Sequence, residues 1–212
     1  MNASLKPQSL AGIRVIDLGR VLAAPFAAQI LGDLGAEVIK IEMPGAGDSL
    51  RKYGTQTDCG DTLVWLSEAR NKKTITLDFR KPEGVELFKK LVAESDVVLE
   101  NFRPGVMQRL GLGIDVLHAR NPRLVVASVS GYGQTGPWVH RRAYAPVVGA
   151  ESGFTKAQGD ARGGVYANDA HSHADVYTAL ECGAAVLAAL FQRERTGRGE
   201  HIDISMAQTM LY

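Results

Sequence analysis

A regular alternation of strand-like and helix-like segments runs through the first 130 residues and limits the fold more than any other feature of the sequence. Five short apolar segments have the composition of strands: 13–18, 36–42, 74–79, 96–100 and 124–129. Helix-like segments begin near Pro25 and Pro82, because proline suits the first turn of a helix, and a short one covers 106–110. Strand–helix–strand units normally pair their strands in parallel. The alternation therefore predicts an α/β fold, with an open, mostly parallel sheet and flanking helices.

The longest helix-like segment is Ala-rich and covers 175–190. Asp175 lies in its first turn, where the helix dipole favours a carboxylate. The residues alone leave two roles open for Asp175, a cap of the helix, which is the commoner role, or a nucleophile that attacks a carbonyl. Together with His171 and His173 it has a spacing that a metal could use, but we prefer polar residues before a helix and predict no metal site. Helical spacing predicts one broad buried face, made of Val176, Leu180, Ala184, Leu187 and Phe191.

The segment ENFRPG, at 100–105, follows a predicted strand and also has two interpretations. Phe102 could belong to the core and Arg103 could be a solvated charge. Alternatively, both could hold a nucleotide, because ligands bind at the carboxyl edge of open α/β sheets and arginine suits phosphate. The dinucleotide-binding, P-loop and hydrolase-elbow motifs are absent from the sequence. The glycine-rich segment 131–168 is predicted to be a long surface connection, with loops that fold over a ligand as the alternative.

Composition argues against several classes of protein. The net charge of +1 does not indicate nucleic acid as a partner. Residues 1–10 lack the apolar centre of a secretory signal, and no apolar segment is expected to span a bilayer. Cys59 and Cys182 are too few for a disulfide framework and fit a reducing compartment. The sequence therefore predicts a cytoplasmic protein that does not contact membranes.

Five motifs occur in one order along the chain: LAGIRVIDLGRVLAAPFAAQILGDLGAEVIKIE, NKKTITLD, ENFRPG, GYGQTGP and LAALFQRERTGRGEHIDIS. Together they resemble the amino-terminal half of the class III CoA-transferases, the family of formyl-CoA transferase and carnitine CoA-transferase. The resemblance implies a Rossmann-like large domain, a smaller domain and an interlocked homodimer. Residues 1–212 would then be the amino-terminal part of the CoA-binding large domain, without the small domain and without the carboxyl-terminal segment that returns to the large one.

The resemblance also implies which residues act. Its nucleophile is an aspartate just before the Ala-rich helix, which is the place of Asp175, and Asp169 is the second choice because it lies too far upstream. Coenzyme A or acyl-CoA is the implied substrate, and no tightly bound cofactor is implied. The implied CoA-binding positions, from the thioester end to the nucleotide end and the loop over the pantetheine arm, are Leu22, Ala23, Leu77, Asp78, Phe79, Arg80, Asn101, Phe102, Arg103, Arg109, Arg141, Arg142 and Tyr144.

The implied reaction transfers CoA between an acyl-CoA donor and a carboxylic acid acceptor, through aspartyl anhydride and aspartyl-CoA intermediates. Formyl-CoA transferase has glutamine where this chain has Leu22, which indicates a donor less polar than formyl- or oxalyl-CoA. Two alternatives are an α-methylacyl-CoA racemase of the same fold and a non-catalytic acyl-CoA-binding subunit. Tyr144 and Ala145 stand where the racemase resemblance would require a His–Asp pair, which argues against racemisation.

Overall fold

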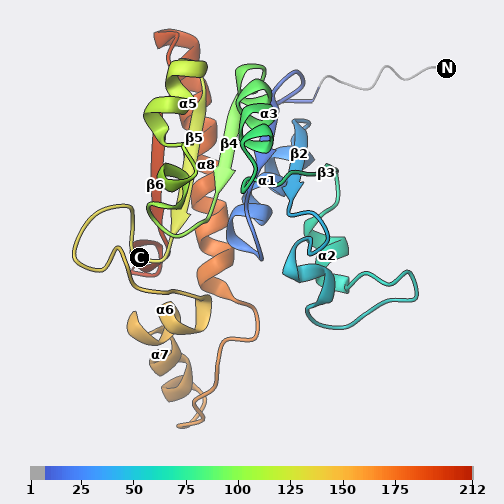
Figure 1. Ribbon diagram of the computed structural model, residues 1–212. Helices are drawn as coiled ribbons and strands as arrows, with labels where there is room; N and C mark the ends of the chain where they lie inside the picture. Colours follow the sequence, from blue (N-terminus) through green and yellow to red (C-terminus); the bar gives the residue numbers. More distant parts are fainter. Residues whose placement is uncertain (1–7, 212) are drawn as a thin grey trace, which may run out of the picture.

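The computed structural model describes residues 8–211, and its centre is one six-stranded sheet (Figure 1). All neighbouring strands are parallel, in the order β3-β2-β1-β4-β5-β6. The predicted open α/β sheet is confirmed, and this strand order is that of the Rossmann fold, with its switch point between β1 and β4. Of the N-terminal residues expected to lack a secretory signal, 1–7 lie outside the described part. The strands are β1 (Arg14–Asp17), β2 (Glu37–Glu42), β3 (Lys72–Thr76), β4 (Val97–Glu100), β5 (Val125–Ser130) and β6 (His201–Ser205).

Helices cover both faces of the sheet, and the two faces are packed differently. Small residues such as Ala27, Ala28 and Ala179 fill the first face, whereas large ones such as Phe88 and Leu117 fill the second. Small side chains let helices and strands approach closely, so the first face is the more tightly spaced. The first face carries α1 (Ala23–Asp33) and α8 (His173–Thr196), and the second carries α3 (Pro82–Ala93), α4 (Val106–Arg109) and α5 (Ile114–Arg120).

The predicted helix at 175–190 exists as α8, but its predicted buried face is wrong. Leu180 and Phe191 are 52% and 68% exposed, and the buried side instead carries small residues such as Cys182 and Gly183. A Cβ on Gly183 would lie 3.8 Å from Ile30 of α1, so the small side is the one that permits close packing of the two helices. By length and hydropathy α8 could span a bilayer, contrary to the sequence-based expectation. Its packing against α1 and the sheet identifies it as a core helix.

The glycine-rich segment 131–168 is not a plain surface connection, since it contains α6 (Ala145–Glu151) and α7 (Phe154–Ala161). Ala145 and Val148 of α6 form a small cluster with Ala174 of α8 and Met206, which holds this segment against the start of α8. Figure 1 shows α6, α7 and the first turn of α8 beyond the carboxyl ends of the strands. The remaining elements, η1 (Ser49–Lys52), α2 (Leu63–Glu68) and α9 (Met206–Thr209), are short, and α2, α5 and β6 had not been predicted.

Candidate active site

Asp175 lies in the first turn of α8, beside the first turn of α1. The backbone N–H of Ala23, the first residue of α1, faces its carboxylate. Burial raises the pKa of Asp175 to about 6, and the nearby Ala23 N–H opposes that rise. The sequence had suggested that the helix dipole would dominate, whereas burial has the larger effect on this pKa. A pKa of about 6 still leaves the carboxylate largely ionised at neutral pH. Among residues 8–211, no charged side chain contributes to the raised pKa of Asp175.

Leu22 and Ala23 form the end of the turn between β1 and α1. Leu22 occupies the N-cap position of α1, and no side chain caps the helix there. The first N–H groups of a helix have no partner within the helix and carry its positive end. The turn therefore presents backbone donors toward Asp175, as the predicted place of the thioester end requires.

Asp169, the second choice for the nucleophile, is bound by the residues around it. It accepts the N–H of His171 at 3.1 Å and also the N–H of His173, and it pairs with Nδ1 of His173 at 2.8 Å. These hydrogen bonds lower the pKa of Asp169, although burial acts in the opposite direction. The geometry is that of a carboxylate that holds the chain at the entry to α8. Within the described residues, no three His, Cys, Asp or Glu side chains lie close enough to bind a metal together.

Three of the residues predicted at the nucleotide end line one cavity of about 70 Å³. They are Leu77, Phe79 and Phe102, and they surround it together with the turn at Gly19 and Arg20. Leu77 and Phe79 lie beyond the end of β3, so the predicted strand 74–79 is shorter than expected. The cavity lies at the carboxyl ends of β1, β2 and β4, next to the switch point where open α/β sheets bind ligands.

The polar and charged residues predicted at the nucleotide end form different contacts. Arg80 forms two hydrogen bonds with Asp78, of 2.8 and 2.9 Å, and this pairing lowers the pKa of Asp78 to about 2. Asn101 binds the backbone of Arg20 rather than pointing outward. Arg109 is exposed at the end of α4. Arg80 therefore presents charge to solvent next to Phe79 of the cavity, Arg109 presents charge on α4, and Asn101 joins the end of β4 to the first turn.

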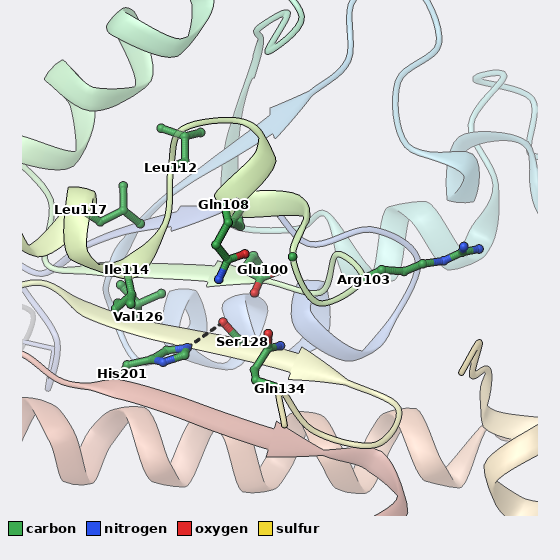
Figure 2. A pocket seen from close by; sticks show the side chains of 12 residues that line it. Glu100, Arg103, Gln108, Leu112, Ile114, Leu117, Val126, Ser128, Gln134 and His201 are labelled. Carbon is green, nitrogen blue, oxygen red and sulfur yellow. Dashed lines mark hydrogen bonds between the residues drawn. The ribbon is translucent and has the colours of Figure 1, made fainter. Parts of the chain in front are cut away.

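Arg103 does not point into the Phe102 cavity. It lines a second cavity of about 20 Å³, although Figure 2 shows its guanidinium directed away from the other side chains. That space is sufficient for about one water molecule and too small for a nucleotide. Phe102 and Arg103 are therefore not brought together as one wall around an adenosine.

Glu100, Ser128 and His201 lie together in the second cavity, and sequence reasoning had missed them (Figure 2). Ser128 Oγ lies 3.0 Å from Nε2 of His201. Burial raises the pKa of Glu100 to about 7, against hydrogen bonds from Ser128 and from the N–H of Phe102. The one signal in the sequence was a glutamate that ends a buried strand, at the start of ENFRPG.

The loop before α6 carries the three residues predicted over the pantetheine arm. Arg141 stacks on Tyr132 and Trp138, with its Cζ 5.0 and 4.8 Å from the ring centroids, and pairs with Glu151. Arg142 is exposed, and Tyr144 is 68% exposed at the start of α6. The loop thus holds Arg141 in place and leaves Arg142 and Tyr144 accessible to a ligand.

Known proteins of similar sequence carry CoA-transferase names. The β subunit of succinyl-CoA–L-malate CoA-transferase from Chloroflexus aurantiacus is 47% identical over 210 residues, which are 99% of this chain and 52% of that protein. Succinyl-CoA:glutarate CoA-transferase from Mus musculus is 41% identical over 208 residues, which are 98% of this chain and 47% of that protein. A crystal structure of a CAIB/BAIF family protein from Brucella suis aligns with a TM-score of 0.87 and 36% identity, over 96% of this chain and 55% of that one.

The chain spans about half the length of the curated relatives it matches. The family model for CoA-transferase family III matches residues 10–212, which is nearly the whole chain. The all-parallel sheet agrees with that match. The chain belongs to CoA-transferase family III.

Proposed function

We propose that the complete protein transfers CoA from an acyl-CoA donor to a carboxylic acid acceptor, with Asp175 as the covalent nucleophile. The observation that carries this proposal is the half-buried carboxylate of Asp175, which faces the uncapped start of α1. Desolvation makes a carboxylate more reactive than it is in water, and a pKa of about 6 keeps it ionised at neutral pH.

The proposed reaction exchanges acyl bonds and needs no oxidant. A carboxylate oxygen of Asp175 attacks the thioester carbonyl, the C–S bond breaks, and an aspartyl anhydride and CoA thiolate form. The thiolate then attacks the aspartyl carbonyl of the anhydride, which releases the donor acid as its carboxylate and leaves an aspartyl-CoA thioester. The acceptor carboxylate repeats the two steps in reverse. Backbone N–H groups at the start of α1 would stabilise the oxyanion of each tetrahedral intermediate.

The proposed path of the CoA molecule follows the carboxyl edge of the sheet. The nucleotide end would occupy the cavity of Leu77, Phe79 and Phe102, next to the exposed charge of Arg80, and the exposed Arg109 would supply a second charge. Arg142 and Tyr144 would cover the pantetheine arm, which leads to the thioester beside Leu22 and Asp175. The apolar side chain of Leu22 supports an acyl group less polar than formyl or oxalyl.

Names of relatives suggest which acids to test first. Two similar proteins are named for succinyl-CoA as donor and for malate or glutarate as acceptor. We therefore propose a dicarboxylic acid as donor or acceptor, and succinyl-CoA as the first donor in a screen. We further propose that residues 1–212 are the amino-terminal part of a CoA-binding large domain, and that the complete protein is a cytoplasmic, interlocked homodimer without a tightly bound cofactor. Sedimentation velocity of the complete protein would test the dimer.

Trapping of the covalent intermediate tests the proposed function. The complete protein is incubated with succinyl-CoA and then with hydroxylamine, which converts an aspartyl anhydride or aspartyl thioester to a hydroxamate. Peptide mass spectrometry should locate the hydroxamate on Asp175. A hydroxamate on Asp169 would assign the nucleophile to the second choice. CoA binding without CoA transfer to any carboxylic acid tested would favour the alternative of a non-catalytic acyl-CoA-binding subunit.

A further inference from the structure

The turn that joins β1 to α1, Gly19–Leu22, has an unfavourable backbone conformation. Val21 has φ +62°, in the left-handed region that a β-branched residue rarely adopts. Leu22 follows with φ −122° and ψ −59°. A conformation of this kind persists only where the surrounding contacts hold it. The turn leads directly into Ala23, whose N–H faces the carboxylate of Asp175.

Side chains from outside the turn bind its backbone groups. Asp17 accepts the N–H of Gly19 at 2.8 Å, and Lys40 donates to the carbonyl of the same residue. Asp48 accepts the N–H of Val21, at 3.3 Å. Acidic and basic side chains thus bind the backbone at both ends of the strained segment, at Gly19 and at Val21.

The side chains that bind the turn belong to a buried network of charged residues. Asp17 is 0% and Lys40 is 1% exposed. Lys40 Nζ lies 3.1 Å from Oδ2 of Asp48, an ion pair that lacks the alignment of a hydrogen bond. Lys72 Nζ binds Oδ2 of Asp17 at 3.0 Å and the carbonyl of Pro25, in the first turn of α1, at 2.7 Å. The network therefore connects β1, β2, β3 and the loop after β2 to the turn and to the start of α1.

Asn101 binds the backbone of Arg20, which lies between Gly19 and Val21. Its Oδ1 accepts the N–H of Arg20 at 2.7 Å and its Nδ2 donates to the carbonyl of Arg20 at 2.8 Å. The backbone of the turn is thus bound at three consecutive residues. Buried ion pairs are weak contributors to stability compared with apolar residues of the same volume. A gain in conformational specificity explains this network better than a gain in stability.

We propose that Lys40, Lys72, Asp17 and Asp48 are positioning residues, which hold the strained turn so that the Ala23 N–H stays directed at the carboxylate of Asp175. The inference rests on the proposed function, in which that carboxylate is the nucleophile. The four residues do not touch the reacting atoms and act through the turn. Their loss should slow transfer and leave acyl-CoA binding largely unchanged.

Variants with opposite changes of charge separate positioning from plain electrostatics. Lys72→Met removes a positive charge, and Asp48→Asn removes a negative charge while it keeps an oxygen for the N–H of Val21. Coulomb effects alone would raise the pKa of Asp175 in the first variant and lower it in the second. Loss of the contact with the Ala23 N–H would raise the pKa of Asp175 in both variants. Lys73→Met is the matched control, because Lys73 neighbours Lys72 on β3 but its side chain is 73% exposed.

Two measurements are made on the complete protein. Selective ¹⁵N-alanine labelling follows the Ala23 amide as the pH is changed, and its titration reports the ionisation of Asp175 without any need for turnover. Steady-state transfer from succinyl-CoA gives kcat and KM. We expect a titration midpoint above that of the wild type in both Lys72→Met and Asp48→Asn, a kcat about tenfold lower and a KM within about twofold, with no change in Lys73→Met.

A lower midpoint in Asp48→Asn, or midpoints and kcat values equal to those of Lys73→Met, would overturn the proposal. Should Lys72→Met fail to fold, the isosteric Asp48→Asn still decides, because positioning and electrostatics predict opposite shifts for it. A wild-type protein without transferase activity would contradict the proposed function alone. The amide titration would then still show whether the network holds Ala23 against Asp175.

Discussion

Two regions flank the candidate nucleophile, and they are held in opposite ways. The first βα turn, Gly19–Leu22, is bound by buried ions and by Asn101. The segment 131–172 is held against α8 by the small apolar cluster of α6, its charged pairs such as Lys156 with Asp160 are exposed, and Val165 and Tyr166 are 64% and 59% exposed. Exposed pairs of this kind contribute little to stability. The difference teaches that the part next to the reacting carbonyl is rigid, whereas the part expected to cover the substrate can adapt to it.

The sharpest test of the comparison uses the candidate nucleophile, which faces the first βα turn, and one carboxylate of the segment 131–172. Asp175→Asn keeps the shape and the acceptor for the Ala23 N–H but removes the nucleophilic oxygen, so kcat should fall by about 10³-fold or more. Asp169→Asn weakens only the entry to α8 and should cost about tenfold or less. Transfer assays with succinyl-CoA, and CoA binding by calorimetry as a folding control, measure both. Equal losses in the two variants would remove the distinction between them.

Glycine substitutions measure the rigidity of the two regions directly. A Cβ on Gly19 would lie 2.7 Å from Ala24 Cβ and 2.7 Å from Pro25 Cδ, in a buried place that cannot yield. Gly19→Ala should therefore lower the free energy of unfolding by about 3 kcal/mol. A Cβ on Gly159 would meet the ring of Tyr166, which is exposed and can turn away.

Gly159→Ala should change the free energy of unfolding by less than about 1 kcal/mol, since alanine also favours the helix. Urea unfolding at neutral pH compares the two variants. A loss at Gly159 as large as that at Gly19 would show that segment 131–172 is as rigid as the turn.

Glu100 lies between the two regions and gives the comparison a dependence on pH. Its folded-state pKa of about 7 is raised above the ordinary value of 4.5. The folded state therefore holds the proton more tightly, so this contribution to stability is fully present below about pH 4.5 and is lost as the pH rises through 7. The Glu100→Gln variant should not lose this stability at high pH. Its free energy of unfolding at pH 8 should be about 2 kcal/mol higher than that of the wild type.

Urea unfolding at pH 8 and at pH 5 measures this contribution, and the two proteins should differ less at pH 5. Ser128→Ala serves as a control, because it removes a hydrogen bond to Glu100 and leaves the carboxyl group in place. A Glu100→Gln protein that is less stable than the wild type at pH 8 would contradict the assignment.

The smallest effects are expected within the adaptable region. Arg142 is exposed, so Arg142→Ala should leave the free energy of unfolding within about 0.5 kcal/mol of the wild type and raise KM for acyl-CoA several-fold. Arg141 stacks on two aromatic rings, so Arg141→Ala should cost about 1 kcal/mol of stability. Thermal unfolding and steady-state kinetics measure both. An unchanged KM in Arg142→Ala would remove this residue from the CoA site.

The fold was more predictable than the site, for physical reasons. Strands such as 36–42 and helices that begin at Pro25 and Pro82 have strong periodicity and clear start signals, so they were found. The helices in 131–168 were missed because Gly149, Gly153 and Gly159 lower helix propensity there. The buried face of α8 was predicted wrongly, because the helical spacing of large apolar side chains does not show which side of the helix packs against the sheet.

Within the site, the place of Asp175 next to Ala23 depended on the resemblance to a family, because the two residues are far apart in the sequence. Lys40 and Lys72 were missed because a lysine in a strand normally indicates a solvent-exposed face. Only the folded sheet shows that the two ammonium groups meet buried carboxylates. Long-range pairing of charges leaves no periodic signal that a single sequence could reveal.

The pairing of β5 with β6 has a consequence for the order in which the chain folds. Val126 of β5 pairs with His201 of β6, so a long loop must close before the sheet is complete. Closure of such a loop is entropically costly and slow. The pairing of Val15 with Val97 across the switch point closes a loop of similar length, whereas the other neighbouring strands pair through shorter connections. We expect α8 to dock on α1 in the step that adds β6 to the paired strands β1 to β5. A chain that stalls before this step would already contain the Phe102 cavity, yet Asp175 would still be distant from Ala23.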